Sequence, residues 1–153
     1  MKFTFLFVDK TRSKLWQAAE AEYLNRLGHF VKYEIKIIPP VKNKTPEECL
    51  RLESQKIITS ASRSDSYLVV LEKSGVNISS TELAHRLDSW QMQGQNITFI
   101  IGGAFGLSKE LRAKASFVWS LSNLTFTHEM IRTLIFEQLY RAFTINKNIP
   151  YHY

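Results

Sequence analysis

The chain has 153 residues, of which 44% are hydrophobic and 22% are charged. This length and composition predict one globular domain, residues 1–153, that buries about 70% of the surface of its unfolded chain. No apolar run approaches the ~20 residues that a membrane-spanning helix needs. The formal net charge is +6, from 20 basic and 14 acidic side chains, which permits a nucleic-acid partner without diagnosing one.

The cysteine and histidine residues indicate the cellular compartment and whether a metal site is present. The single cysteine, Cys49, excludes an internal disulfide and favours a reducing compartment, so we expect a cytoplasmic protein. The apolar start Met1–Val8 is followed directly by Asp9 and Lys10, without a small-residue cleavage site, and is interpreted as a strand rather than a signal peptide. No metal site is predicted, because ligand spacing is absent from the four histidines: His29, His85, His128 and His152.

The first half of the chain alternates between strand-like and helix-like patterns. Lys2–Val8 is an apolar run typical of a buried strand, and Leu15–Leu27 carries apolar residues at helical spacing. Phe30–Ile38 alternates apolar and charged residues and predicts a strand with one wet face. Thr45, followed by Pro and two Glu, is a helix start, and that helix should end near Ser62.

The second half continues the alternation. We expect strands over Tyr67–Leu71, Ile97–Ile101 and Phe117–Ser122, and helices capped by Ser79, Ser108 and Thr127. The final helix should bury Ile131 to Phe143 at helical spacing and show Arg132, Glu137 and Arg141 on other faces. Strands that alternate with helices predict a parallel α/β sheet, for which periodicity alone indicates an ordinary flavodoxin-like layered fold.

The most informative stretch is the glycine cluster that follows the strand Ile97–Ile101. Gly102, Gly103 and Gly106 supply positive φ and let a ligand approach the backbone closely, at the sheet edge where ligands bind in open α/β folds. The order G-G-x-x-G excludes a dinucleotide fingerprint, and the absence of Gly-Lys-Ser/Thr excludes a P-loop. A tight turn without a ligand is the alternative interpretation.

A wider set of motifs surrounds these glycines. It comprises I-G-G-x-x-G-L-S, then W-S-L-S-x-L-T-F-x-H, then R-x-x-x-x-E-Q-L-Y-R-A-F, and a final P-Y-H. The constellation resembles the SPOUT-class methyltransferases of the RlmH type, which modify pseudouridine N3 in large-subunit ribosomal RNA. The resemblance runs nearly the full length and implies a C-terminal trefoil knot, S-adenosylmethionine as cofactor, and a homodimer that acts on the assembled ribosome.

The resemblance also implies which residues hold the cofactor, bent among three loops at the knot. They follow three successive strands and are Leu71, Gly102, Gly103, Leu121, Ser122, Asn123, Leu124, Thr125 and Phe126. All lie at strand ends, as the ligand rule expects. Without the resemblance, plain core packing explains Leu71, Leu124 and Phe126.

The catalytic residues that we assign lie at the end of the chain. An aromatic–His–aromatic tail suits stacking on a base, and the resemblance implies that Tyr151 and His152 cover the active site of the partner subunit. His152 is a candidate proton acceptor, with water or the ribosome as alternatives. Arg141 is assigned to substrate binding, although pairing with Glu137 is the alternative. Tyr153 stands where relatives often carry a basic residue.

Other interpretations stay open at this point. Arg132 is expected to pair with Glu129 or to meet RNA phosphate, and His128 either bonds a loop or shapes the cofactor pocket. A different RNA target, a non-enzymatic ribosome-binding module, and a flavin- or nucleotide-binding protein are the rival functions. Binding of S-adenosylmethionine, the mapped methylated product and an absorbance spectrum distinguish them.

Overall fold

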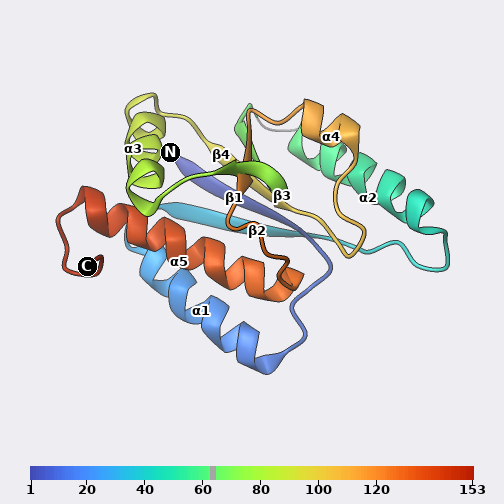
Figure 1. Cartoon of the computed structure of the whole chain (residues 1–153), viewed down its shortest axis with the longest axis horizontal. Coiled ribbons are helices and arrows are strands. Elements are labelled where there is room, and N and C mark those ends of the chain that lie inside the picture. Colours follow the sequence, from blue (N-terminus) through green and yellow to red (C-terminus); the bar gives the residue numbers. More distant parts are fainter. Residues whose placement is uncertain (63–64) are drawn as a thin grey trace.

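The computed structural model describes residues 1–62 and 65–153 and shows strands that alternate with helices (Figure 1). The strands are β1 (Lys2–Val8), β2 (Lys32–Ile38), β3 (Tyr67–Asn77), β4 (Ile97–Ile101) and β5 (Phe117–Ser120). The helices are α1 (Lys14–Gly28), α2 (Pro46–Ala61), α3 (Ser80–Met92), α4 (Lys109–Ala113) and α5 (His128–Asn146). The predicted α/β class is confirmed.

The sheet is parallel throughout, with the order β2-β1-β4-β3-β5. β4 lies in the middle, and all five of its residues are buried, as expected for a parallel strand covered on both faces. Phe99 of β4 is level with Phe5 of β1 and Val69 of β3. The parallel sheet is therefore confirmed, whereas the trefoil knot stays a prediction.

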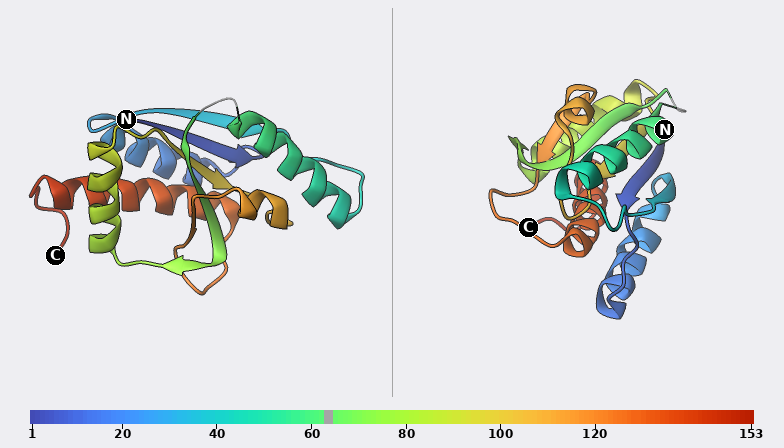
Figure 2. Two further views of the ribbon diagram at one scale, coloured as in Figure 1. Left: turned by 90° about the horizontal axis from the view of Figure 1, so that it is seen from above. Right: turned by 90° about the vertical axis from the view of Figure 1, so that its right-hand side faces the viewer.

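Alternate residues of the strands supply two hydrophobic cores, one on each face of the sheet. Figure 2 shows the helices that cover the two faces. Phe5 and Phe99, whose ring centroids are 5.3 Å apart, belong to the larger core, which also contains residues of α1, α3 and α5. Leu6 and Ile100 belong to the smaller core, with residues of α2 and α4. Because all strands run the same way, their carboxyl ends meet at one edge.

The prediction of one wet face for β2 is wrong, because both faces are largely open. Tyr33, Ile35 and Ile37 are 37%, 38% and 44% exposed, and the alternate residues between them are charged. β2 is an edge strand whose only neighbour is β1, and only Ile38 at its end is buried.

The third strand is longer than its apolar run predicts. β3 continues beyond Leu71 to Asn77, through a register shift relative to β5 between Leu71 and Val76. Gly75 permits the close approach of β3 to β5 there, since a Cβ on it would lie 2.6 Å from the Val118 carbonyl oxygen. Glu72–Gly75 therefore belongs to a strand and not to a loop.

Thr45 caps α2 as the sequence predicts. Its hydroxyl accepts a hydrogen bond from the Glu48 backbone N–H at 3.2 Å, and the Glu48 carboxylate accepts one from the Thr45 N–H at 3.3 Å. We expect Thr45→Ala to lower the free energy of unfolding by about 1 kcal/mol, measured by urea titration. Thr59→Ala, an exposed change within the same helix, is the control and should cost nothing. An equal loss in both variants would contradict the role of the cap.

Candidate functional site

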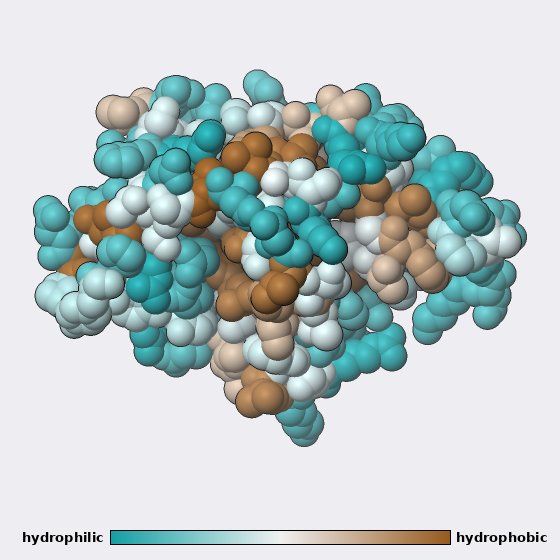
Figure 3. Space-filling view, viewed as in Figure 1, coloured by the Kyte–Doolittle hydropathy of each residue, from teal (hydrophilic) through white to brown (hydrophobic). Residues whose placement is uncertain are grey.

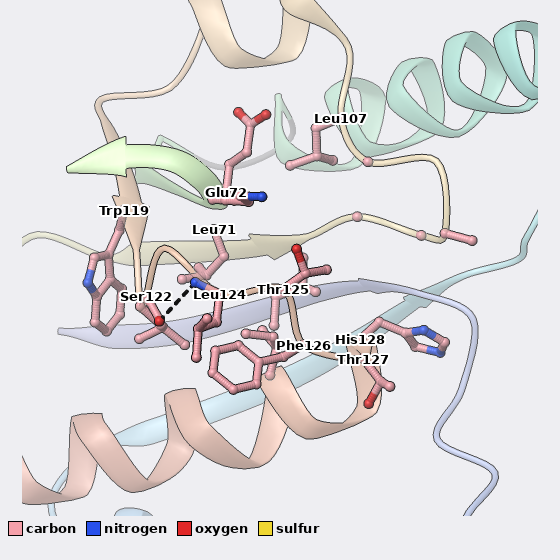
Figure 4. A pocket seen from close by; sticks show the side chains of 18 residues that line it. Leu71, Glu72, Leu107, Trp119, Ser122, Leu124, Thr125, Phe126, Thr127 and His128 are labelled. Carbon is pink, nitrogen blue, oxygen red and sulfur yellow. Dashed lines mark hydrogen bonds between the residues drawn. The ribbon is translucent and has the colours of Figure 1, made fainter. Parts of the chain in front are cut away.

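A cavity of about 550 Å³ lies at the carboxyl ends of β4 and β5 and beside Leu71–Lys73 of β3 (Figure 4). The strand register explains the position of the cavity, because Leu71 of β3 is level with Ile101 of β4 and with Trp119 of β5. Eight of the nine residues assigned to the cofactor line it: Leu71, Gly102, Gly103, Leu121, Ser122, Leu124, Thr125 and Phe126. Asn123 is not part of the lining.

The glycine loop owes its shape mainly to close packing rather than to left-handed backbone. Only Gly106 of its three glycines has positive φ, at 81°. A Cβ on Gly102 would lie 2.6 Å from the Gly106 carbonyl oxygen, and one on Gly103 would lie 2.9 Å from Oε2 of Glu53. The prediction of positive φ holds for Gly106 alone, while Gly102 and Gly103 are required by the backbone and side chains that crowd them.

The loop after β5 forms the opposite wall and is held by its own hydrogen bonds. Ser122 Oγ accepts from the Leu124 N–H at 3.0 Å, and the Ser120 hydroxyl donates to the Ser122 carbonyl at 2.9 Å. Leu124 is 69% exposed, so this wall carries an apolar side chain open to solvent. Thr127 ends the loop by capping α5, since its hydroxyl accepts from the Met130 N–H.

Polar side chains in the lining include two that the assignment of cofactor residues omitted. His128, the first residue of α5, lines the cavity, which agrees with the pocket-shaping alternative for this residue. Glu72 also lines it and pairs with Arg112 of α4 at 3.0 Å. The signal for Glu72 was its place next to Leu71, but the strand was expected to end there.

The structure places the assigned catalytic residues together, far from this cavity in the same chain. Arg141 bonds Glu137 at 3.0 Å and lies 4.6 Å from the Tyr151 ring centroid, while its Nη1 is 3.5 Å from His152 Nδ1. His128 and Arg141 are separated by about 20 Å along α5, given the rise of an α-helix. The tail lies at the opposite end of α5 from the cavity (Figure 1).

Tyr151 anchors this cluster. Its hydroxyl donates to Glu137 at 3.0 Å and lies 3.5 Å from the Tyr23 hydroxyl. Burial, followed by the contacts with Tyr23 and Glu137, raises the Tyr151 pKa above its ordinary value. The hydrogen bond to Glu137 attaches the tail to α5. Arg141 makes the contact with Glu137 that was the alternative to its assignment to substrate binding, and that assignment stays a prediction.

The prediction that Arg132 lies on an open face of α5 is wrong. The residue is 1% exposed, and its guanidinium donates to the carbonyls of Val8 and Asp9 at 2.8 and 3.0 Å and to the Thr11 hydroxyl at 2.9 Å. It forms no ion pair with Glu129, which accepts instead from the Arg12 backbone N–H at 2.6 Å. Arg132 thus binds the loop after β1 and has a structural role.

Residues 1–62 and 65–153 contain neither a candidate metal site nor a membrane-spanning helix. No group of three or more His, Cys, Asp or Glu side chains there could hold a metal ion. Within the same residues, none of the helices combines the length and apolar character needed to cross a bilayer. Cys49 is a free, buried thiol.

A parallel α/β sheet with a cavity at its carboxyl edge is the arrangement in which open α/β proteins bind ligands, and sequence comparison shows the family of this chain. Residues 1–152 match the family model described as predicted SPOUT methyltransferase, and the chain belongs to that family. It is 36% identical, over 154 aligned positions and the full length of both chains, to the ribosomal RNA large subunit methyltransferase H of Dictyoglomus thermophilum. The resemblance seen in the motifs is thereby confirmed.

Solved structures support the same fold at much lower identity. A probable methylase family protein from Haemophilus influenzae Rd KW20 has a TM-score of 0.58 and 15% identity, with 99% of this chain and 71% of that chain covered. The SpoU methyltransferase AviRb from Streptomyces viridochromogenes, solved with the cofactor AdoMet, has a TM-score of 0.50 and 15% identity, with coverages of 97% and 58%. The SPOUT fold is therefore shown.

Proposed function

We propose that this protein uses S-adenosylmethionine to methylate pseudouridine N3 in large-subunit ribosomal RNA, as a homodimer on the assembled ribosome. The observation that carries the proposal is that eight of the nine assigned cofactor residues line one cavity of a chain that belongs to the SPOUT family. The name of the full-length relative supports a ribosomal RNA substrate. A reduced thiol at Cys49 fits a cytoplasmic location, and residues 1–153 are taken as one domain.

The cavity suits the proposed cofactor in size and chemistry. Its volume of about 550 Å³ lies within the range of small-molecule pockets, roughly 300–1,000 Å³. Leu71, Leu124 and Phe126 offer apolar contact for a purine base, and the backbone at Gly102–Gly103 is bare enough for close hydrogen bonds. Bound there, S-adenosylmethionine supplies an electrophilic methyl group.

The chain's own contribution to the reaction is alignment and handling of one proton. Methyl transfer to a nitrogen needs an in-line approach and exclusion of water, so few side chains have to act chemically. His152 is proposed to accept the imino proton of the target base, because histidine titrates near neutral pH. Tyr151 positions this histidine, and Arg141 binds RNA phosphate.

The proposal includes a dimer because the cavity and the tail of one chain lie far apart. With about 20 Å of α5 between them, the tail serves the cavity of a second copy. A second hollow, of about 390 Å³, adjoins the first and is lined by apolar side chains that include Leu83, Leu121 and Leu134. Figure 3 shows apolar side chains gathered around the middle of this face. A partner copy of α5 would cover them.

The direct test is transfer of labelled methyl from S-adenosylmethionine to whole ribosomes that lack the modification, and separately to naked ribosomal RNA. Label on the ribosomes that maps to a pseudouridine is the expected result. Absence of label on both, with the cofactor still bound, would point to another RNA. Absence of both label and cofactor binding would overturn the enzyme function.

Gly102→Ala should weaken cofactor binding. The new Cβ would lie 2.6 Å from the Gly106 carbonyl oxygen and 2.8 Å from Leu107 Cδ2, so the loop has to move away from its cavity-forming position. We expect the dissociation constant, measured by calorimetry, to rise about tenfold, which corresponds to roughly 1.4 kcal/mol. Gly28→Ala is the matched control, because its Cβ would make only an ordinary 3.5 Å contact with Tyr33.

A further inference from the structure

Glu72 is a carboxylate in the lining of the cavity, for which no role has been assigned above. Because neighbouring strand residues face opposite sides of a sheet, it faces α4 while Leu71 packs into the larger core. In the view of Figure 4, Glu72 lies on the same side as Leu107, across from Leu124 and Phe126. A carboxylate therefore lies across the cavity from these apolar side chains.

The two oxygens of this carboxylate differ in their surroundings. Oε1 forms an ion pair with Nη1 of Arg112 at 3.0 Å. Oε2 is buried, and none of the residues in the ranges 1–62 and 65–153 hydrogen-bonds to it. An unpaired buried acceptor is costly, and more so on a charged group, so a ligand that donates a hydrogen bond to Oε2 removes that cost.

The charge of Arg112 indicates which kind of donor fits. A cationic donor such as an ammonium group would be attracted by Glu72 and repelled by the adjacent guanidinium, so the pair offers it little net attraction. A neutral hydroxyl needs only the acceptor. In nucleotide-binding α/β proteins a carboxylate near a strand end reads a ribose hydroxyl in this way.

We propose that Oε2 of Glu72 accepts a hydrogen bond from a ribose hydroxyl of the cofactor, and that Arg112 holds the carboxylate in place. The inference rests on the proposed function, since it requires a nucleoside in the cavity. Glu72 is a binding residue that selects ribonucleosides and takes no part in methyl transfer.

The test is a binding cycle between one ligand hydroxyl and one side chain. Calorimetry on the full chain compares S-adenosylhomocysteine with its 2′-deoxy and 3′-deoxy analogues. For the wild type, one analogue should bind about ten- to thirtyfold more weakly than the parent, as expected for a hydrogen bond to a charged group. In Glu72→Ala this discrimination should fall to about threefold or less, because the two changes remove the same contact.

Two further variants sharpen the cycle. Glu110→Ala, an exposed change on the same short helix as Arg112, should keep the full discrimination of the wild type. Glu72→Gln keeps an oxygen for Arg112 and serves where the alanine variant does not fold; its discrimination should also fall. Discrimination that persists in both Glu72 variants, or is absent from the wild type, overturns the inference while cofactor binding stands. Failure of the wild type to bind S-adenosylhomocysteine overturns the proposed function together with the inference.

Discussion

Arg132→Met is expected to lower the free energy of unfolding by about 3 kcal/mol, a large share of the stability of a domain of this size. The substitution removes three hydrogen bonds, to the carbonyls of Val8 and Asp9 and to the Thr11 hydroxyl. Val8 and Thr11 are buried and Asp9 is half-buried, and each buried acceptor that is left unsatisfied costs about 1–3 kcal/mol. Relief of the desolvation of the guanidinium offsets part of this loss.

Several contacts make the position specific for arginine. The guanidinium carbon lies 4.7 Å from the centroid of the Phe7 ring, and the planar fork reaches two carbonyls at once. Burial lowers the Arg132 pKa, while the charges of Glu20, Glu129 and Asp9 act in the opposite direction. The cation is therefore held by carbonyl dipoles and by a surrounding negative field, and a lysine cannot reproduce the fork.

Urea unfolding followed by circular dichroism measures the effect. Arg132→Lys should recover less than half of the loss, because it keeps the charge without the geometry. Arg51→Ala, on the exposed side of α2, is the control and should change stability by no more than about 0.5 kcal/mol. A methionine variant as stable as the wild type would show that the acceptors after β1 find water instead.

Arg132 also shows which structural features helical periodicity predicts and which it does not. Ile135, Phe136 and Leu139 are fully buried and stand three, four and seven residues further along α5, so the spacing placed Arg132 on the buried side. Because arginine is charged, its residue type predicted a surface position, and that prediction was wrong. The acceptors that make burial tolerable lie in a loop more than a hundred residues away, which no local pattern reveals.

The cavity was more predictable than the arginine. Parallel strands have their carboxyl ends at one edge of the sheet, so the ends of β4 and β5 lie beside Leu71, where the apolar run of β3 stops. Glu72 was missed because the apolar run stops at Leu71, whereas the strand continues through polar residues to Asn77. Strand length there depends on pairing with β5, which is a tertiary property.

Loss of the tail is expected to abolish methyl transfer while leaving cofactor binding intact. His152→Ala should slow transfer at least 100-fold, the lower range for removal of a proton acceptor. The dissociation constant for S-adenosylmethionine should not change, because His152 is proposed to act on the target base and is not among the residues that line the cavity. Tyr153→Ala is the matched control at the next position, where the side chain is fully exposed and has no assigned role in the reaction.

Mixing two inactive variants tests whether the tail acts on the partner subunit. One variant is His152→Ala, which keeps an intact cavity, and the other is Gly102→Val, which keeps an intact tail but fills the space beside Gly106. Random pairing makes about half of the dimers mixed, and each mixed dimer contains one complete site when the tail acts across the interface. Methyl transfer should then return to about a quarter of the wild-type rate.

A tail that acts within its own chain predicts the opposite result, because neither variant carries both parts and mixing adds nothing. Recovery of methyl transfer on mixing therefore requires mixed dimers. An effect of either substitution on folding would not produce it. Unmixed samples of each variant, refolded identically, set the baseline. Since about 20 Å of helix separates cavity and tail in one chain, recovery is the outcome that the geometry of α5 requires.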